Sequence, residues 1–278
     1  MKIVAPSFFF SKEMSFADSI ARVGALGYDG IDLSIGGDRN QPLVGSEWKE
    51  YAAMVRAAAE KAGVATVQSH LPGEISLPQD FLKDLIRGLG EIGVGSTVAH
   101  PIWIVDGRVI YDEDEFFSLN LPIYKELTKA AEEAGVVLMC ENLCWGPSMD
   151  PVAMSKMVKE INSPYFGWCF DTGHANIFDI NAASLKGLVT PYSLHIHDNH
   201  GGKEGDRERR HASMYTDEHL PPFDGTIDWQ SFAKALTDIG YKGEFVLEAG
   251  CPDGVDVYAY LRDLLERSRR IMAMIPQK

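Results

Sequence analysis

Residues 192–200, YSLHIHDNH, join a short apolar strand pattern to a cluster of polar residues. Three of the chain's eight histidines lie in this stretch. Imidazole is costly to bury without a partner, and it is also a frequent ligand of metals. The stretch is therefore either a solvated, histidine-rich loop or the end of a strand that supplies a metal site. The strand patterns in the rest of the chain distinguish these two interpretations.

Short apolar, β-rich runs alternate with amphipathic helical patterns along the chain. Several helical patterns begin at a serine and end at a glycine, as helix termini prefer. The helical patterns include 15–27, 46–63, 77–93, 121–135 and 255–275. The expected strands are 2–9, 30–35, 64–71, 96–101, 136–142, 166–172, 192–198 and 244–249. This alternation is typical of a parallel sheet with covered faces.

Eight strand–helix units in this length predict an α/β protein with a single (β/α)8 TIM barrel. A doubly wound open sheet is the main alternative. No GxGxxG follows the first strand and no Walker loop occurs, so the motifs of nucleotide-binding open sheets are missing. No linker or charge block divides the chain, and we expect one domain over residues 1–278.

The composition excludes some partners. Lys and Arg number 26 against 40 Asp and Glu, a net charge of −14, which argues against binding nucleic acid or an anionic membrane. We expect no membrane span and no secretion signal. Cys140 and Cys169 lie in apolar strand patterns and Cys140 and Cys144 form no CxxC pair, so we expect reduced cysteines and a cytoplasmic protein.

One connection is unusually long for a compact domain. About thirty residues separate the seventh strand from its helix, from Asn199 to about Asp228, and loops of this length are usually functional or disordered. A basic group in this loop is expected to form a solvated face: Lys203, Arg207, Arg209 and Arg210.

Polar residues end six of the strands, and the reacting groups of such barrels lie at the carboxyl ends of the strands. Each residue alone has a simpler explanation. His100 could be a packed, hydrogen-bonded histidine, and Asp171 could cap a helix. Glu248 could be the point where a strand meets water. We interpret His197 and His200 as loop residues or as residues that support the site. The strand-end residues are His70, His100, Glu141, Asp171 with His174 after it, His195 and Glu248, and the long loop adds Asp217 and His219.

Four of these residues end successive strands and so share one arc of the barrel mouth. Three carboxylates this close would raise one another's pKa unless a cation compensates them. Three oxygen ligands and one imidazole suit Mn²⁺, Mg²⁺ or Co²⁺, and Zn²⁺ is possible. The sequence therefore predicts one divalent metal held by Glu141, Asp171, His195 and Glu248.

With these residues the chain resembles the xylose-isomerase-like barrels, which are also called the sugar phosphate isomerase/epimerase group. The resemblance spans nearly the whole chain and depends on the order of five motifs: MCEN, DTGHA, HIHDN, DxHLPPxDGTIDW and VLEAG. It implies that Glu141, Asp171, His195 and Glu248 hold one metal, as in ketose 3-epimerases, and that Glu141 and Glu248 move protons on opposite faces of the sugar. It also implies that His174 contacts substrate and that the chain forms a dimer or tetramer.

The chain also departs from the ketose epimerases. Asn199-His200-Gly201 stands where those enzymes carry an arginine. In the endonuclease IV branch, further positions complete a three-zinc cluster that cleaves phosphodiesters, and all of these positions are present here. They match His70, His100, His174, Asp217 and His219.

Three functions follow as hypotheses. The first is a divalent-metal-dependent isomerase or epimerase of a sugar or sugar-like polyhydroxy ketone acting through a metal-stabilised enediolate, or a lyase or dehydratase using the same step. The second is a multi-zinc phosphodiesterase or AP-endonuclease-like hydrolase. The third is a metal- or sugar-binding barrel that has lost its catalytic activity. The loop 249–256, AGCPDGVD, has no basic residue to grip phosphate, which favours an unphosphorylated substrate. Three aromatic residues lie in loops at the expected active end of the barrel: Trp103, Trp145 and Phe223. They either form an apolar platform for one face of a sugar or simply pack the loops.

Overall fold

The computed structural model describes residues 1–6, 9, 14–33, 48–206, 212 and 216–275. Eight parallel strands close into a barrel in the order β1-β10-β9-β8-β7-β4-β3-β2. The predicted TIM barrel is confirmed and the open sheet is excluded, because β1 pairs with both β10 and β2. The strands are β1 (Ile3–Ala5), β2 (Gly30–Asp32), β3 (Ala65–Glu74), β4 (Ser96–His100), β7 (Val137–Glu141), β8 (Phe166–Asp171), β9 (Ser193–Ile196) and β10 (Glu244–Leu247).

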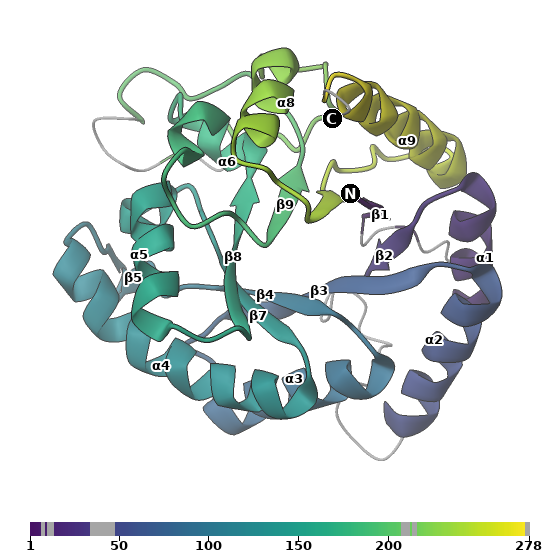
Figure 1. The fold of residues 1–278 in the computed structure, drawn as a ribbon, viewed down its shortest axis with the longest axis horizontal. Helices are drawn as coiled ribbons and strands as arrows, with labels where there is room; N and C mark the ends of the chain where they lie inside the picture. Colours follow the sequence, from purple (N-terminus) through teal and green to yellow (C-terminus); the bar gives the residue numbers. More distant parts are fainter. Residues whose placement is uncertain (7–8, 10–13, 34–47, 207–211, 213–215, 276–278) are drawn as a thin grey trace.

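Helices surround the strands on the outside of the barrel (Figure 1). They are α1 (Phe16–Leu26), α2 (Trp48–Ala62), α3 (Gln79–Ile92), α4 (Glu113–Ala134), α5 (Pro151–Ile161), α6 (Thr172–Ile177), α8 (Trp229–Asp238) and α9 (Val257–Ala273). A small hairpin of β5 (Ile104–Val105) and β6 (Arg108–Val109) and the 3-10 turns η1 (Gly146–Met149) and η2 (Ala182–Leu185) complete the described elements. Within the described ranges, none of the helices is long and apolar enough to cross a membrane.

The helix termini follow local sequence rules. Ser15 caps α1 by accepting a hydrogen bond from the Asp18 backbone N–H, and Gly27 ends the helix with a left-handed φ of 94°. The predicted start of α4 at residue 121 is wrong: the helix begins eight residues earlier, at Glu113, where Asp112 caps it, and Pro122 lies inside it. The second predicted serine cap, Ser46, lies outside the described residues.

The strands divide their side chains between two sides of the barrel wall, because successive residues of a strand point to opposite faces. One set packs against the helices and forms the main core. The other set points inward, where Val98, Met139 and Cys169 form a small apolar cluster. Glu141 and Asp171 follow Met139 and Cys169 by two residues, so both carboxylates also point inward at the carboxyl end of the barrel.

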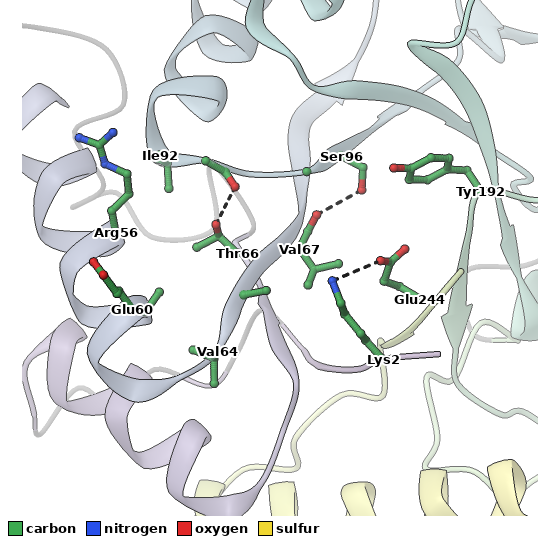
Figure 2. Close-up of a pocket in the computed structure, with 14 residues that line it drawn as sticks. Lys2, Arg56, Glu60, Val64, Thr66, Val67, Ile92, Ser96, Tyr192 and Glu244 are labelled. Carbon is green, nitrogen blue, oxygen red and sulfur yellow. Dashed lines mark hydrogen bonds and ion pairs between the residues drawn. The ribbon is translucent and has the colours of Figure 1, made fainter. Parts of the chain in front are cut away.

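The amino end of the barrel has a hollow of its own, with a volume of about 560 Å³ (Figure 2). Residues at or just before the starts of strands line it, among them Lys2, Ser96 and Glu244. Lys2 and Glu244 form a long ion pair of 4.0 Å between Nζ and Oε1. Since the strands are parallel, this hollow lies at the opposite end of the barrel from the inward carboxylates.

The four cysteines form no disulfide, which agrees with the expectation of reduced thiols. Cys140 and Cys169 are fully buried in β7 and β8. Burial raises the pKa of each of these two thiols to about 12, so both stay protonated and unreactive at neutral pH.

Candidate metal centre

Four side chains from four neighbouring strands meet at the carboxyl end of the barrel. Glu141 and Asp171 end β7 and β8, His195 lies in β9, and Glu248 directly follows β10. One potential ligand atom from each residue lies within 4.8 Å of the others. His195 Nδ1 is 3.1 Å from Glu141 Oε1 and 3.1 Å from Glu248 Oε2. The structure thus brings together the four residues that the sequence singled out.

Asp171 also serves as a helix cap, so the two interpretations of this residue are compatible. Its Oδ1 accepts a hydrogen bond from the His174 backbone N–H at 2.6 Å, at the start of α6. The Asn142 amide accepts from the Asp171 backbone N–H at 2.8 Å and donates to the Asp171 carbonyl at 3.1 Å. These bonds fix the carboxylate before any ligand binds.

A second group of potential ligands shares Glu141. Its Oε2 lies 3.4 Å from His70 Nε2 and 3.2 Å from His100 Nε2, while its Oε1 faces His195. The expectation that the third strand ends at His70 is wrong: the strand continues to Glu74 after an irregularity, because Glu74 regains pairing with His100. His70 and His100 nevertheless both face the site.

A third group lies on the side of the long loop. His174, His197, Asp217 and His219 each offer a ligand atom within the same 4.8 Å limit. Asp217 Oδ2 is 3.2 Å from His174 Nε2 and 3.1 Å from His219 Nε2. The His197 ring stacks on the His219 ring, with centroids 3.9 Å apart and an interplanar angle of 7°.

Backbone carbonyls fix the rings of two histidines in this third group. His174 Nδ1–H donates to the Asn142 carbonyl at 2.8 Å, and His219 Nδ1–H donates to the Glu248 carbonyl at 2.8 Å. A carbonyl only accepts hydrogen bonds, so each ring directs Nε2 toward Asp217. This is the arrangement in which proteins commonly present imidazole to a metal.

The histidine protons compensate the carboxylates in the metal-free protein. Burial lowers the pKa of His70, but hydrogen bonds to Asp32 and Glu141 outweigh it and raise the pKa to about 10. For His219, burial is likewise outweighed by the Asp217 carboxylate, and the pKa rises to about 9. Burial opposes ionisation of Glu141, yet the neighbouring histidines hold its pKa well below the usual range.

The residues of the centre fit a divalent metal. Two buried carboxylate oxygens, Glu248 Oε2 and Asp217 Oδ1, accept no well-aligned hydrogen bond from the residues that the structure describes, although His195 Nδ1 lies 3.1 Å from Glu248 Oε2. Buried polar atoms without partners are rare, and unpaired oxygens in clusters of carboxylate and imidazole groups suit a cation. The first group, with three carboxylates and one imidazole, favours a hard metal, whereas the third group, with three imidazoles and one carboxylate, favours zinc.

Sequence reasoning placed His197 only among loop or supporting residues, and it missed Asp32. His197 is fully buried, and its Nε2–H donates to both carboxylate oxygens of Asp171 at 3.0 Å. Its ring fits because residue 173 is glycine: a Cβ there would lie 2.0 Å from His197 Cε1. Asp32, the last residue of β2, lies 3.8 Å from His70 Nδ1. The strand-end rule would have found Asp32 had the end of this strand been placed correctly.

A buried carboxylate organises the long loop that carries Asp217 and His219. Asp198 is fully buried and accepts from the backbone N–H groups of residues 199, 223 and 227 and from the Trp229 indole N–H. Its backbone also pairs with Leu220 in an isolated bridge. The neighbouring His200 is exposed and pairs with Glu218, and the expected basic positions 207, 209 and 210 lie outside the described residues.

Two of the three loop aromatics pair with each other. Trp103 and Trp145 stack with centroids 4.2 Å apart and an interplanar angle of 18°. Phe223 instead packs toward Trp229, and the Arg270 guanidinium lies 4.0 Å from the centre of its ring. Phe223 therefore takes part in ordinary packing with Trp229 and Arg270, and a platform for a sugar face stays a prediction.

Comparisons with known proteins agree with this fold. A family model described as "Xylose isomerase-like TIM barrel" matches residues 20–271. An uncharacterised protein of Methanocaldococcus jannaschii is 28% identical over 68% of this chain and 63% of that protein's length. A D-psicose 3-epimerase of Enterocloster bolteae is 27% identical over 86% of this chain and 79% of its own length.

Solved structures share the fold at lower identity. A D-psicose 3-epimerase of Clostridium cellulolyticum, solved with D-tagatose, has a TM-score of 0.74 and 19% identity over 98% of this chain and 99% of that chain. The IOLI protein, solved with a bound zinc atom, has a TM-score of 0.75 and 16% identity over 99% of this chain and 98% of that chain.

Proposed function

Because this chain belongs to the xylose isomerase-like TIM barrel family, we propose that it is a divalent-metal-dependent isomerase or epimerase of a sugar or sugar-like polyhydroxy ketone. The observation that carries the proposal is the group of Glu141, Asp171, His195 and Glu248 at the mouth of the barrel. The similarity to a D-psicose 3-epimerase supports a ketose as the substrate.

Two glutamates supply the chemistry of proton transfer in this proposal. When bound, a divalent metal would polarise neighbouring carbonyl and hydroxyl oxygens of the substrate. Glu141 and Glu248 both have lowered pKa values because histidines face them, so both are ionised and able to accept a proton at neutral pH. One carboxylate takes the proton from the carbon next to the carbonyl. The second carboxylate, once it has taken a proton from water, delivers that proton to the other side of the carbon, and the first then releases its proton to water.

The substrate is proposed to be an unphosphorylated carbohydrate rather than a nucleic acid. The loop 249–256 after β10 carries two aspartates and no basic residue, and the net charge of the chain is −14. The four unpaired cysteines support a cytoplasmic location. A single domain over residues 1–278 and a homo-oligomer stay predictions, the second from the family resemblance alone.

Substitution of the two glutamates tests the proposal. Metal-free protein would be reloaded with Mn²⁺ and screened against ketoses by chromatography of the products. With the substrate found, we expect Glu141→Gln and Glu248→Gln to reduce kcat by about 10²–10⁴-fold, the usual contribution of a general acid or base. Glu218→Gln is the matched control, because this loop glutamate pairs with the exposed His200. Full turnover by Glu248→Gln would contradict the mechanism.

The two additional ligand groups favour a second candidate, a multi-zinc phosphodiesterase. Its specific support is the orientation of His174 and His219, whose Nε2 atoms both face Asp217. This candidate predicts three zinc ions per chain and nicking of duplex DNA that contains an abasic site. One bound metal with no nicking by the zinc-loaded protein would remove it.

A further inference from the structure

The hollow at the amino end of the barrel takes no part in the proposed reaction, since Glu141 and Glu248 lie at the opposite end. Its volume of about 560 Å³ lies within the range of about 300–1,000 Å³ that small-molecule sites occupy. Charged residues such as Lys2 and apolar ones such as Val67 share its lining. The residues that form this hollow therefore need an explanation of their own.

Small residues leave this end of the barrel unfilled. The interior of a TIM barrel is normally packed with layers of side chains in which branched residues dominate. Here Ala65, Ser96 and Gly167, at or next to the starts of β3, β4 and β8, occupy inward positions near the amino end. The next inward layer closes the hollow toward the centre of the barrel with three packed valines: Val4, Val67 and Val246. Packed side chains thus separate the hollow from the metal centre.

Four polar side chains reach into the hollow from different strands (Figure 2). Lys2 directly precedes β1, Ser96 begins β4, Tyr192 directly precedes β9 and Glu244 begins β10. Tyr192 fits there because residue 167 is glycine: a Cβ at that position would lie 2.8 Å from Tyr192 Cβ. Burial, and after it the Glu244 carboxylate, raises the pKa of the Tyr192 hydroxyl, which therefore stays protonated and able to donate at neutral pH.

The charged pair in the hollow has room for a third partner. Lys2 Nζ and Glu244 Oε1 are 4.0 Å apart, which is longer than the roughly 2.7–3.2 Å of a direct hydrogen bond. A hydroxyl group both accepts and donates, so one hydroxyl between them accepts from the ammonium and donates to the carboxylate. Ser96 is buried, and its Oγ donates to the Val67 carbonyl at 3.3 Å, which leaves the oxygen of this hydroxyl as an acceptor for a ligand.

The charges around the hollow cancel, which favours a neutral ligand. They are Lys2 and Arg56 against Glu60 and Glu244. An anion such as phosphate would be repelled by the two carboxylates and by the partial negative charge at the C-terminal end of α3, where Ile92 and Gly93 line the hollow. A cation would be repelled by the two basic side chains.

We propose that the hollow is a second binding site and that it takes a neutral polyhydroxy compound, such as a sugar. Neighbouring hydroxyls of the ligand bridge Lys2 and Glu244, and Tyr192 donates a further hydrogen bond. The carbon face of the ligand covers the apolar surface of Ala65 and Val67. The site needs no metal, and it does not depend on the function proposed for the other end of the barrel.

Methyl NMR of the full chain tests the site with four probes, the methyl glycosides of glucose, galactose, mannose and xylose. These probes are neutral and have no carbonyl group, so the proposed isomerase reaction cannot change them. We expect saturable shifts of the Ala65, Val67 and Ile92 methyl signals with at least one glycoside, and the same Kd with and without Mn²⁺. Shifts confined to the methyl group of Met139, two residues before Glu141 in β7, would place the sugar at the metal centre instead and overturn the proposal.

Substitutions in the hollow test which groups bind the ligand. Glu244→Gln keeps the size of the side chain and removes its charge, and we expect binding at least about 10-fold weaker, because hydrogen bonds to charged groups are the strong ones. Glu126→Gln is the matched control with an unchanged Kd, since this exposed glutamate of α4 pairs with Lys129. Ala65→Leu should abolish binding because it fills the hollow.

Three results would each overturn the proposal. The first is the absence of saturable shifts with all four glycosides. The second is an equal Kd in Glu244→Gln and the wild type. The third is binding of inorganic phosphate at the hollow in place of the glycosides, which would contradict the neutral class of ligand.

Discussion

Replacement of His70 by glutamine should destabilise the metal-free protein at neutral pH and have little effect near pH 10. His70 lies against Glu141 and Asp32, and the pKa of its imidazolium is about 10 in the folded chain. In the unfolded chain this pKa is about 6.5. A folded pKa above the unfolded one adds stability that is fully present below pH 6.5 and is lost as the pH rises through 10.

The magnitude follows from the difference between the two pKa values. Linkage gives His70 about 4 kcal/mol of stabilisation at pH 7 and less than about 1 kcal/mol at pH 10. Urea unfolding in the presence of a chelator, at both pH values, measures the free energy of unfolding of wild type and His70→Gln. His200→Gln is the control, because that imidazole is exposed and pairs only with Glu218. An equal loss of stability from pH 7 to pH 10 in wild type and His70→Gln would refute the argument that imidazolium groups compensate the buried carboxylates.

Three further predictions concern the same centre. Gly173→Ala should destabilise the protein by about 1–3 kcal/mol in urea unfolding, because the added methyl group overlaps the buried ring of His197. Asp198→Ala should cost about 3 kcal/mol or more and should expose the long loop to proteolysis, because it leaves four buried or partly buried donors, the Trp229 indole among them, without their acceptor. Mn²⁺ at a hundred times its Kd should stabilise the wild type by about 2.7 kcal/mol and should not stabilise Glu141→Ala, as calorimetric melting would show.

The barrel follows from sequence because its strands are short, apolar and regularly spaced. Each predicted strand contains or overlaps an observed one, since burial on both faces leaves a clear signal. The boundaries were harder to place, as at the start of α4, where the cap Asp112 acts through a hydrogen bond to Glu115 that composition alone does not reveal. The strand that contains His70 continued further than predicted because pairing resumed beyond an irregularity.

The strand-end rule found most of the candidate site because carboxyl ends of parallel strands converge at one face of a barrel. It could not find residues whose importance depends on tertiary contacts. His197 contacts Asp171 only because its ring fits over Gly173 and against the His219 ring.

Hydrogen exchange at the substrate carbon tests the central claim most directly. The Mn²⁺-loaded protein would be incubated with a panel of ketoses in deuterated water, and the products would be analysed by NMR and mass spectrometry. The account predicts that one deuterium enters the substrate at a carbon next to the carbonyl, together with inversion at that carbon or isomerisation, and that Glu248→Gln abolishes this exchange. Retention of every carbon-bound proton across the panel, with cleavage of phosphodiesters by the zinc-loaded protein, would contradict it.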